Sequence, residues 1–416
     1  MGRRPGYRRG VIELTPTDIA HGGEAVARLY GKAHFVAGVM PGERVEGEVV
    51  VDKGSWARVE LRRVLDASSE RVEPPCPHFG SCGGCQWQFA DYPAQLRWKQ
   101  SIVTGQLAHL GGIADPPVRP IVAAGEPFGY RNRMDFRVVD GKPALHQMRS
   151  NHLVPLDVCL VLHSDVRAVF ESLGDLSGVR RLILRAGVTT GERLAVVEGD
   201  VPPHADTWDA DLAQRAKSGL RVIRGSGRIH ERIDGVTLQI TGGAFFQNHT
   251  AGAACLVELA GEALAIEAGD TLLDGYAGGG LFGATLGRHA ARVVAVEVSP
   301  LAVSDLRHNL RAAGVGDHRV VKGTFEEEAQ RLDEYWNVAV VDPPREGLGI
   351  GGVTAVTAAG PRTIAYVSCD PASLARDTRY LADAGYGLDW VTPVDLFPQT
   401  FHVEAVARFS RVGPTF

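Results

Sequence analysis

Two short segments in the second half of the chain place reactive side chains directly after apolar, strand-like runs. Asp342-Pro343-Pro344-Arg345 follows VAVV, and Ser368-Cys369-Asp370-Pro371 follows IAYV and begins a helical segment. Open α/β sheets bind ligands at the carboxyl ends of their strands, and partial positive charge at a helix N-terminus favours a thiolate. The neighbouring Asp370 carboxylate opposes this effect, but the position of Cys369 at a strand end, one loop from DPPR, predicts a functional thiol rather than a core residue. A buried structural cysteine and a simple strand-ending turn are the alternatives.

A third candidate group lies near the end of the chain. His402-Val403-Glu404 begins the last apolar run, so His402 and Glu404 fall on one face of the expected strand. A carboxylate there can act as a general base. An exposed glutamate on a surface strand has the same pattern, so both interpretations stay open.

A glycine-rich turn indicates a nucleoside cofactor. The segment 274–283 reads DGYAGGGLFG and joins an apolar run to a helical one. Gly278, Gly280 and Gly283 match the GxGxxG spacing, which lets bare backbone approach a ligand. Glu297 ends the next apolar run, where an acidic side chain can accept both hydroxyls of a ribose. The spacing alone serves dinucleotides and other adenosyl ligands equally.

The cysteines predict a soft-metal site. Cys76, Cys82 and Cys85 fall within ten residues, and Cys159 is available as a fourth thiol ligand. Two ligands two residues apart can chelate one centre around small glycines. Four thiolates suit either structural zinc or an iron–sulfur cluster, and their spacing does not separate the two. Cys255 lies in an apolar helical segment and is expected in the core.

The elements that position these residues change in character along the chain. Residues 1–65 alternate apolar and polar side chains between glycines and prolines, as in an OB-like antiparallel barrel. Residues 66–240 are expected to form a mixed α/β domain around the cysteines, with a helix over 91–113 that packs on the catalytic domain. Residues 241–416 alternate strand and helix, which predicts a doubly wound, mostly parallel sheet.

Composition and charge limit the class of protein. The chain has 416 residues, of which 44% are hydrophobic and 22% charged, as expected for a globular protein. It has no apolar run of about 18 residues that could span a membrane, and its beginning does not resemble a secretory signal. Six cysteines are too few for a disulfide scaffold. We therefore expect a cytoplasmic protein without a membrane partner.

The net charge of −5 is unevenly distributed, so a nucleic acid would have to bind at local patches. Four arginines, Arg3, Arg4, Arg8 and Arg9, form a basic arm. Trp56, Arg58 and Glu60 can share one face of a strand, and the segment 130–133, with sequence YRNR, combines charge with an aromatic ring. These segments are candidate RNA contacts.

The ordered motifs together resemble a known family. FFQ at Phe245-Phe246-Gln247, the DGYAGGG turn, Glu297, DPPR, SCDP and the terminal HVE resemble the motifs of the RNA uracil-5 methyltransferases that use S-adenosylmethionine. GGEAVARLYGKAHFVAGVMPGERV is similar to a TRAM domain, and CPHFGSCGGC with Cys159 is similar to that family's 4Fe-4S site. The resemblance covers almost the whole chain and points to the 23S rRNA branch.

The resemblance implies a fold and a set of roles. The fold would be α/β, with a Rossmann-like class I methyltransferase domain, an N-terminal TRAM barrel and a central iron–sulfur domain. The expected S-adenosylmethionine contacts are Gln247, Tyr276, Glu297 and Asp342; the nucleophile and base are Cys369 and Glu404; the cluster ligands are Cys76, Cys82, Cys85 and Cys159. Two positions depart from the family pattern, since Ala277 and Leu281 stand where Cys and Asn are usual.

The implied reaction is methylation of carbon-5 of a uridine in 23S rRNA by a monomeric enzyme. The Cys369 thiolate would attack carbon-6, and Glu404 would later remove the carbon-5 proton. Three alternatives remain at this point. They are the same chemistry on tRNA, a noncatalytic RNA-binding protein on a methyltransferase scaffold, and an NAD-dependent dehydrogenase, which rests on GxGxxG alone.

Overall fold

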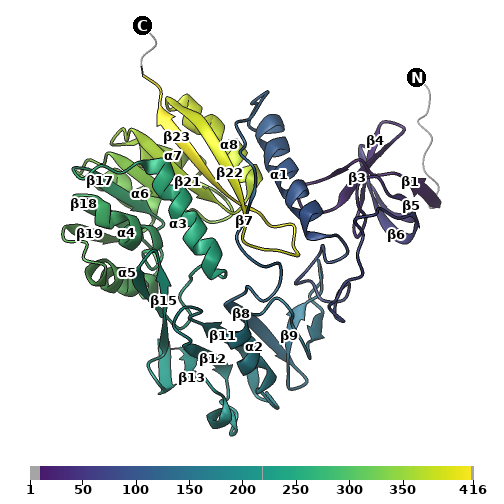
Figure 1. The fold of residues 1–416 in the computed structure, drawn as a ribbon, viewed down its shortest axis with the longest axis horizontal. Helices are drawn as coiled ribbons and strands as arrows, with labels where there is room; N and C mark the ends of the chain where they lie inside the picture. The colour runs from purple at the N-terminus through teal and green to yellow at the C-terminus, as the bar shows by residue number, and fades with distance from the viewer. Residues whose placement is uncertain (1–9, 218, 414–416) are drawn as a thin grey trace.

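A computed structural model describes residues 10–217 and 219–413. Their strands form an N-terminal sheet, a central sheet, a two-stranded ribbon and a C-terminal sheet. Figure 1 shows the N-terminal sheet beside helix α1 (Tyr92–His109), the central sheet below, and the C-terminal sheet on the far side of α1. The basic arm of Arg3, Arg4, Arg8 and Arg9 lies outside the described residues. No helix in the described ranges is both long and apolar enough to cross a membrane.

The N-terminal sheet has the strand order β1-β5-β6-β4-β3-β2. Its strands are β1 (Val11–Leu14), β2 (Asp18–Ile19), β3 (Ala25–Leu29), β4 (Lys32–Val36), β5 (Arg44–Asp52) and β6 (Trp56–Asp66). Register shifts in the β5–β6 pairing mark bulges, which increase the twist of a sheet. The predicted alternation is confirmed on β6, where Ala57 and Val59 are buried while Trp56 and Arg58 are partly exposed on the other face.

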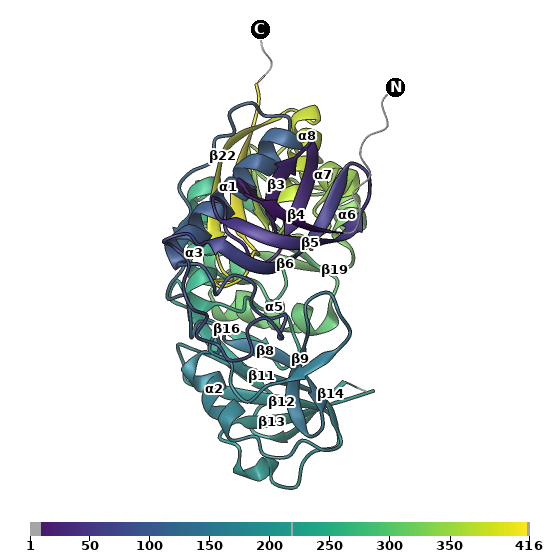
Figure 2. The ribbon, with the colours of Figure 1, turned by 90° about the vertical axis from the view of Figure 1, so that its right-hand side faces the viewer.

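The central sheet runs β10-β9-β8-β11-β12-β13-β14 and is antiparallel except where β12 pairs with β13. Its strands are β8 (Arg133–Val139), β9 (Lys142–His146), β10 (Leu153–Pro155), β11 (Val179–Ala186), β12 (Arg193–Gly199), β13 (Asp211–Ala216) and β14 (Gly219–Arg224). Helix α2 (Ser164–Glu171) packs on one face of this sheet through Val166, Val169 and Phe170. In Figure 2 the sheet occupies the end of the molecule opposite the other two.

The C-terminal sheet has the order β19-β18-β17-β20-β21-β23-β22-β7. Its strands are β7 (Val122–Ala123), β17 (Thr271–Gly275), β18 (Arg292–Glu297), β19 (His318–Lys322), β20 (Val338–Val341), β21 (Thr363–Ser368), β22 (Tyr386–Asp395) and β23 (Glu404–Arg411). Strands β17 to β21 are parallel, and β23 pairs antiparallel with both β21 and β22. The doubly wound, mostly parallel sheet predicted for this half is confirmed.

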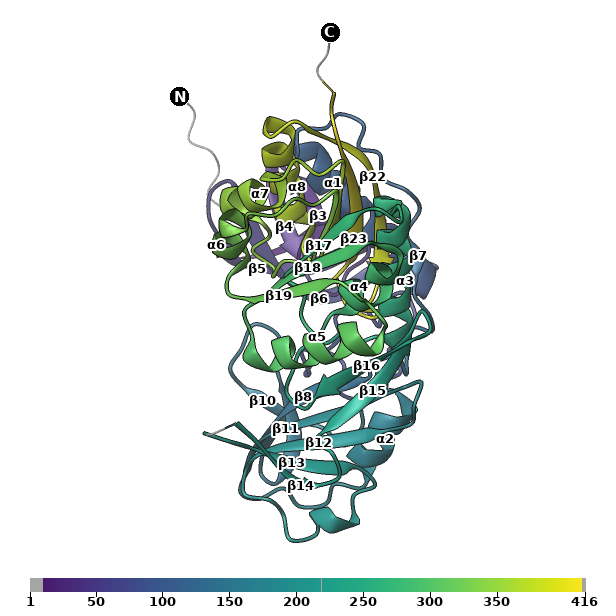
Figure 3. The same ribbon diagram turned by 90° about the vertical axis from the view of Figure 1, so that its left-hand side faces the viewer.

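Helices cover both faces of the C-terminal sheet. They are α3 (Thr250–Leu264), α4 (Leu281–Thr285), α5 (Pro300–Ala312), α6 (Phe325–Arg331), α7 (Gly349–Thr357) and α8 (Pro371–Asp383). The ribbon of β15 (Arg228–Ile233) and β16 (Val236–Thr241) lies beside α5 (Figure 3). Asn309 of α5 accepts from the Gln239 backbone N–H at 2.7 Å, and Asp305 accepts from the Thr241 N–H at 2.7 Å. These bonds fix the ribbon to the sheet's helical layer.

Helix α1 connects the N-terminal half of the chain to the catalytic side of the C-terminal sheet. It begins after Asp91, whose side chain accepts from the Ala94 backbone N–H, and it packs on α8. Lys99 donates to Asp395 at 2.6 Å, and both side chains are fully buried. Removing one partner of such a pair would leave an uncompensated buried charge, at a cost of roughly 3–5 kcal/mol.

Candidate active site

A cavity of about 860 Å³ lies at the carboxyl ends of the parallel strands, and we call it the catalytic pocket. It brings together all six side chains that the sequence predicted for catalysis and cofactor binding, namely Gln247, Tyr276, Glu297, Asp342, Cys369 and Glu404. These residues come from the ends of β17, β18, β20 and β21, the beginning of β23, and the segment before α3. Because open α/β sheets bind ligands at the carboxyl ends of their strands, segments that are distant in the sequence meet at this edge.

The glycine turn and Glu297 form one wall of the catalytic pocket. One Glu297 oxygen accepts from the Gly278 N–H at 2.8 Å, and the other accepts from the Ser299 N–H at 2.7 Å. Asp274 accepts from the Gly283 N–H at 2.8 Å, and a Cβ at Gly283 would lie 2.7 Å from that carboxylate. Only glycine fits this approach, which explains the third glycine of the motif.

Two residues within the turn segment 274–283 depart from the family pattern, and both face the pocket. Ala277 and Leu281 both line the pocket and are nearly buried, so this part of the wall is apolar. Tyr276 adopts a positive φ of 58°, and its hydroxyl donates to Glu326 at 2.5 Å. The tyrosine ring is therefore held by two residues of α6, Glu326 and Phe325, whose ring centroid lies 4.8 Å from that of Tyr276.

Three ionisable groups share the other end of the pocket with little compensating charge. Burial raises the pKa of Asp342 to about 7. Burial, and then the nearby Asp342 charge, raise the pKa of Glu404 to about 8. Burial, followed by the charges of Glu404 and Asp342, raises the pKa of the Cys369 thiol to about 12, whereas Arg345 acts in the opposite direction. Near neutral pH the free site thus holds a thiol beside carboxyl groups that bind protons readily.

Local contacts fix the residues around this acid–thiol group. Gln247 donates to Asp342 at 3.2 Å. Asp370 is the N-cap of α8 and accepts from the Ser373 N–H at 2.8 Å, with Pro371 as the first helical residue, as predicted. His21, from the turn between β2 and β3, lies 3.1 Å from the other Asp370 oxygen. The N-terminal sheet therefore contacts the residue next to Cys369.

The loop before Glu404 is held by residues that the motifs did not indicate. Gln95 accepts from the Gln399 N–H at 3.0 Å, and Lys99 donates to the Phe397 carbonyl at 2.9 Å. Gln399 has a positive φ of 70°, which is a strained conformation for a residue other than glycine. The loop therefore keeps this conformation only because contacts with its surroundings hold it. Gln95 and Lys99 lie within the expected helix 91–113, but no motif in the sequence indicated these contacts.

The segment 130–133 differs from its predicted role. Tyr130 is buried, stacks on His249 at 5.0 Å between ring centroids, and donates to the Pro398 carbonyl at 3.1 Å. Asn132 and Arg133 are also buried and bond to backbone carbonyls. The prediction that this aromatic ring stacks on RNA is therefore wrong; only Arg131 reaches the catalytic pocket.

The four predicted cluster ligands, Cys76, Cys82, Cys85 and Cys159, line one cavity of about 330 Å³, which we call the thiol cavity. Burial, assisted by neighbouring thiols, raises the pKa of Cys85 to about 11 and of Cys159 to about 12. The Gly84 N–H donates to the Cys82 sulfur at 3.3 Å. Among the described residues, no three His, Cys, Asp or Glu side chains are grouped closely enough to hold a single metal ion. The four soft sulfur donors line one cavity together, which fits a group bound through sulfur.

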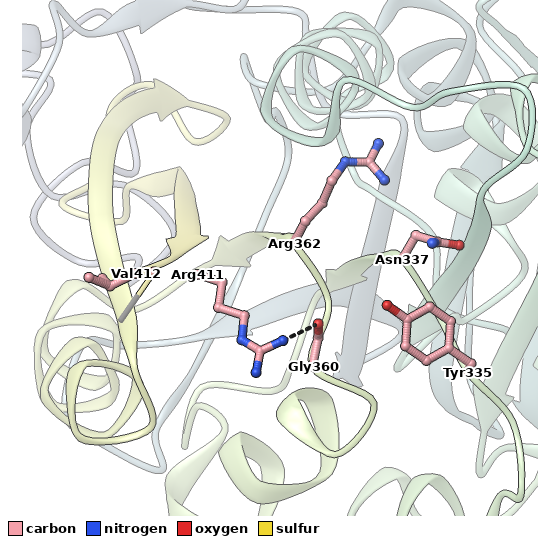
Figure 4. A pocket seen from close by; sticks show the side chains of 7 residues that line it. Tyr335, Asn337, Gly360, Arg362, Arg411 and Val412 are labelled. Carbon is pink, nitrogen blue, oxygen red and sulfur yellow. Dashed lines mark hydrogen bonds between the residues drawn. The ribbon is translucent and has the colours of Figure 1, made fainter. Parts of the chain in front are cut away.

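Another cavity, of about 610 Å³, lies around the amino ends of β20 and β21 and the end of β23 (Figure 4). Its arginines are engaged within the fold. Arg362 donates to both oxygens of Asp270 at 2.6 Å, and Arg411 donates to the Gly360 carbonyl at 3.5 Å. Because ligands of open α/β sheets bind at the opposite edge, this cavity is not the candidate active site.

The fold and the catalytic pocket define an α/β enzyme that binds a nucleoside cofactor beside a partly buried thiol and two carboxyl groups, of which Glu404 is buried and Asp342 partly buried. The family profile of tRNA (uracil-5-)-methyltransferases matches residues 223–412. The chain is 37% identical to an uncharacterized RNA methyltransferase of Gloeobacter violaceus over 96% of each chain. It is 33% identical to the 23S rRNA (uracil(1939)-C(5))-methyltransferase RlmD of Edwardsiella ictaluri, over 98% of this chain and 97% of that one.

A solved structure shares the same α/β methyltransferase fold. It is the tRNA (uracil-54, C5)-methyltransferase of Pyrococcus abyssi in complex with S-adenosyl-L-homocysteine, with a TM-score of 0.75 at 25% identity, covering 95% of this chain and 99% of that one. The chain therefore belongs to the family of S-adenosylmethionine-dependent RNA (uracil-5-)-methyltransferases. Family membership disagrees with the dehydrogenase and noncatalytic alternatives.

Proposed function

We propose that this enzyme methylates carbon-5 of a uridine in 23S rRNA through a covalent bond between Cys369 and the uracil ring. The meeting of Cys369, Glu404 and Asp342 in one pocket with the glycine turn carries this proposal. The choice of 23S rRNA is supported by the RlmD relative, which matches at 33% identity over 97% of its length. The same chemistry on tRNA is the second candidate, supported by the Pyrococcus abyssi tRNA enzyme.

Four residues are proposed to bind S-adenosylmethionine. Glu297, at the end of β18, suits the ribose hydroxyls, while Gln247, Tyr276 and Asp342 line the remainder of the cleft. The bare backbone of the glycine turn lets the ligand approach closely. The cofactor, when bound, supplies an electrophilic methyl group. Because Leu281 is apolar and nearly buried, binding at the turn relies on backbone groups and on Glu297.

Cys369 is proposed to be the nucleophile. Carbon-5 of uracil is too weak a nucleophile for direct methylation, so the thiolate first adds to carbon-6 and leaves an enolate whose electrons reach carbon-5. The neighbouring Arg345 charge favours the thiolate, opposing burial and the two acids. Arg345 can also stabilise the negative charge that develops on the base, and Asp342 in its protonated form can donate a hydrogen bond to it.

Glu404 is proposed to be the base that removes the carbon-5 proton after methylation. Loss of that proton allows the carbon-6–sulfur bond to break, which returns the Cys369 thiolate and restores the aromatic ring. A buried carboxylate with a pKa of about 8 binds a proton strongly enough to accept one from carbon. Its position at the first residue of β23 keeps it fixed beside the ring.

The remaining parts of the chain are proposed to bind a cluster and RNA. Cys76, Cys82, Cys85 and Cys159 would hold a 4Fe-4S cluster, because all four thiols line one cavity and four cysteine thiolates are the usual ligands of such a cluster. Bound there, the cluster would tie loop 76–85 to the segment around Cys159. We retain the division into a TRAM domain (1–65), an iron–sulfur domain (66–240) and a methyltransferase domain (241–416).

The test uses the full chain with transcripts of 23S rRNA and tRNA and labelled S-adenosylmethionine. The parent enzyme should methylate the 23S rRNA transcript, and RNA containing 5-fluorouridine should remain covalently attached, because fluorine at carbon-5 blocks the elimination. Cys369→Ala should abolish both results. Product formation by Cys369→Ala at the parent rate would contradict the mechanism, and methylation of tRNA alone would contradict the substrate.

A further inference from the structure

A second cavity, of about 570 Å³, adjoins the catalytic pocket. The two cavities share Gly83, Gln86, Arg345 and His402. The opposite wall of the second cavity is the tip of the β9–β10 hairpin, residues 146–151, and we call it the hairpin groove. Any RNA strand whose uridine enters the catalytic pocket must continue along a surface next to it, and the hairpin groove is such a surface.

The hairpin wall is fixed in place by contacts from two other parts of the chain. The Gly83 N–H donates to the His146 carbonyl at 2.9 Å, and a Cβ at Gly83 would lie 2.6 Å from that oxygen. Arg149 donates to Glu24 of the N-terminal sheet at 2.9 Å and adopts a positive φ of 57°. A strained residue that its surroundings hold in position is typical of ligand clamps.

The groove has an excess of positive charge. Arg149 and Arg345 line the groove, whereas no acidic side chain in the described ranges lines it. Glu24, which lies outside this lining, accepts from Arg149 and also from Arg58. Arg345 is exposed on the shared wall, and within the described ranges it forms no ion pair, although the exposed Glu346 follows it in sequence. A net positive groove suits the phosphate groups of RNA.

The floor of the groove can receive a base. The Phe401 and His402 rings lie 4.3 Å apart between centroids, at 41°. Burial, followed by the charges of Arg345 and Lys99, lowers the pKa of His402 to about 4, so its ring is neutral at pH 7. Aromatic rings and arginine planes are the surfaces on which single-stranded bases stack. Met148, 41% exposed at the hairpin tip, adds an apolar contact from the other side.

We propose that the hairpin groove binds the nucleotide adjacent to the target uridine, with its phosphate held by Arg149 and Arg345 and its base against His402 and Phe401. The proposal rests on the proposed function, because it takes RNA as the substrate. It assigns part of the recognition of RNA to a hairpin whose residues 146–151 line the adjoining groove and not the catalytic pocket itself. The hairpin would select single-stranded RNA that can lie flat along the groove beside the flipped uridine.

Noncovalent binding of the methylated transcript, measured over a range of salt concentrations, tests the phosphate contact. Arg149→Ala should lower the slope of log Kd against log salt by about 0.7, the contribution of one phosphate contact to a single strand, and should raise KM about fivefold or more with little change in kcat. Arg149→Lys should keep the slope, because a point charge suffices. Arg292→Ala, which removes an arginine paired with Asp317 at the other end of β18, is the control and should keep the parent slope. A parent slope and KM in Arg149→Ala would overturn the proposal.

Crosslinking separates this proposal from the mechanism. The full chain is trapped on RNA containing 5-fluorouridine and then irradiated, and the nucleotide beside the trapped base should crosslink within residues 146–151 or 401–402. Crosslinks of that nucleotide to other segments would contradict the hairpin groove while leaving the mechanism intact. If no adduct forms at Cys369, the mechanism fails, and the salt slope still decides for or against the groove.

Discussion

The catalytic pocket and the thiol cavity both bury ionisable side chains, but they are built differently. The pocket takes its groups from the ends of strands in one sheet: Asp342 and Cys369 directly follow the paired strands β20 and β21, and Glu404 pairs with Val394 of β22. The thiol cavity takes its groups from a loop and from the segment around Cys159, which are joined by few regular hydrogen bonds. We therefore expect the catalytic pocket to keep its shape without a ligand, and the shape of the thiol cavity to depend on what it binds.

The largest expected effect concerns the base in the catalytic pocket. Glu404→Gln should lower kcat by about 10²- to 10⁴-fold, the usual contribution of a general base. Because elimination would be blocked after methylation, the variant should accumulate a covalent complex with ordinary RNA, visible as a shifted band under denaturing conditions. Fold and cofactor affinity should be retained, since the strand pairing supplies the shape.

Exposed Glu346, replaced by Gln, is the matched control for Glu404→Gln and should behave like the parent enzyme. Parent turnover in Glu404→Gln would show that another group removes the proton.

Substitutions in the thiol cavity should change the stability of the protein more than its kcat. Cys159→Ser removes one of the four thiols, so we expect loss of bound iron and a fall in Tm of about 5–15 °C, because bound metal contributes to folding free energy and each kcal/mol shifts Tm by about 2–4 °C. The kcat of the protein that remains folded should change less than tenfold. Cys255→Ser, in the partly buried part of α3, is the control and should keep the iron. If Cys159→Ser retained its iron, Cys159 would not be one of the cluster ligands, and the thiol cavity would not depend on it.

The smallest effect is the pH dependence of stability that Glu404 contributes. The folded-state pKa of Glu404, about 8, lies above its ordinary value of 4.5, so between these values the folded chain holds a proton that the unfolded chain has released. Stability must therefore fall as pH rises through this window. The Tm of Glu404→Gln should gain on the parent by several degrees between pH 5 and pH 8. Calorimetry of the RNA-free proteins checks this, and a constant difference would contradict the buried, protonated acid.

Much of the catalytic pocket was predictable because it follows from a rule about strands. An apolar run followed by DPPR or SCDP must end at the ligand-binding edge once the sheet is parallel, and the predicted cap at Asp370 follows from its local sequence. The supporting residues could not be predicted in this way. Gln95, Lys99 and His21 act through contacts with loops far away in the sequence, and nothing in their neighbours indicates those partners.

The failed prediction for the segment 130–133 has a related cause. Arginine and tyrosine side by side indicate either RNA stacking or internal hydrogen bonding, and only the tertiary fold decides between them. Here the Tyr130 hydroxyl satisfies a carbonyl in the loop before Glu404. Apolar and polar periodicity predicts which face of an element is buried, but it does not identify the carbonyl that a buried hydroxyl will meet.

The buried pair of Lys99 and Asp395 has a consequence for how the chain folds as it is synthesised. During synthesis, Lys99 is added to the chain long before Asp395. The lysine of helix α1 therefore has no charge partner until nearly the whole chain has been made. Asp395 ends β22 and Glu404 begins β23, so the last hairpin supplies both the partner of that cation and the proposed base. Maturation of the active centre is thereby tied to the finishing of synthesis, and a truncated chain would carry an unmatched charge instead of a partly working enzyme.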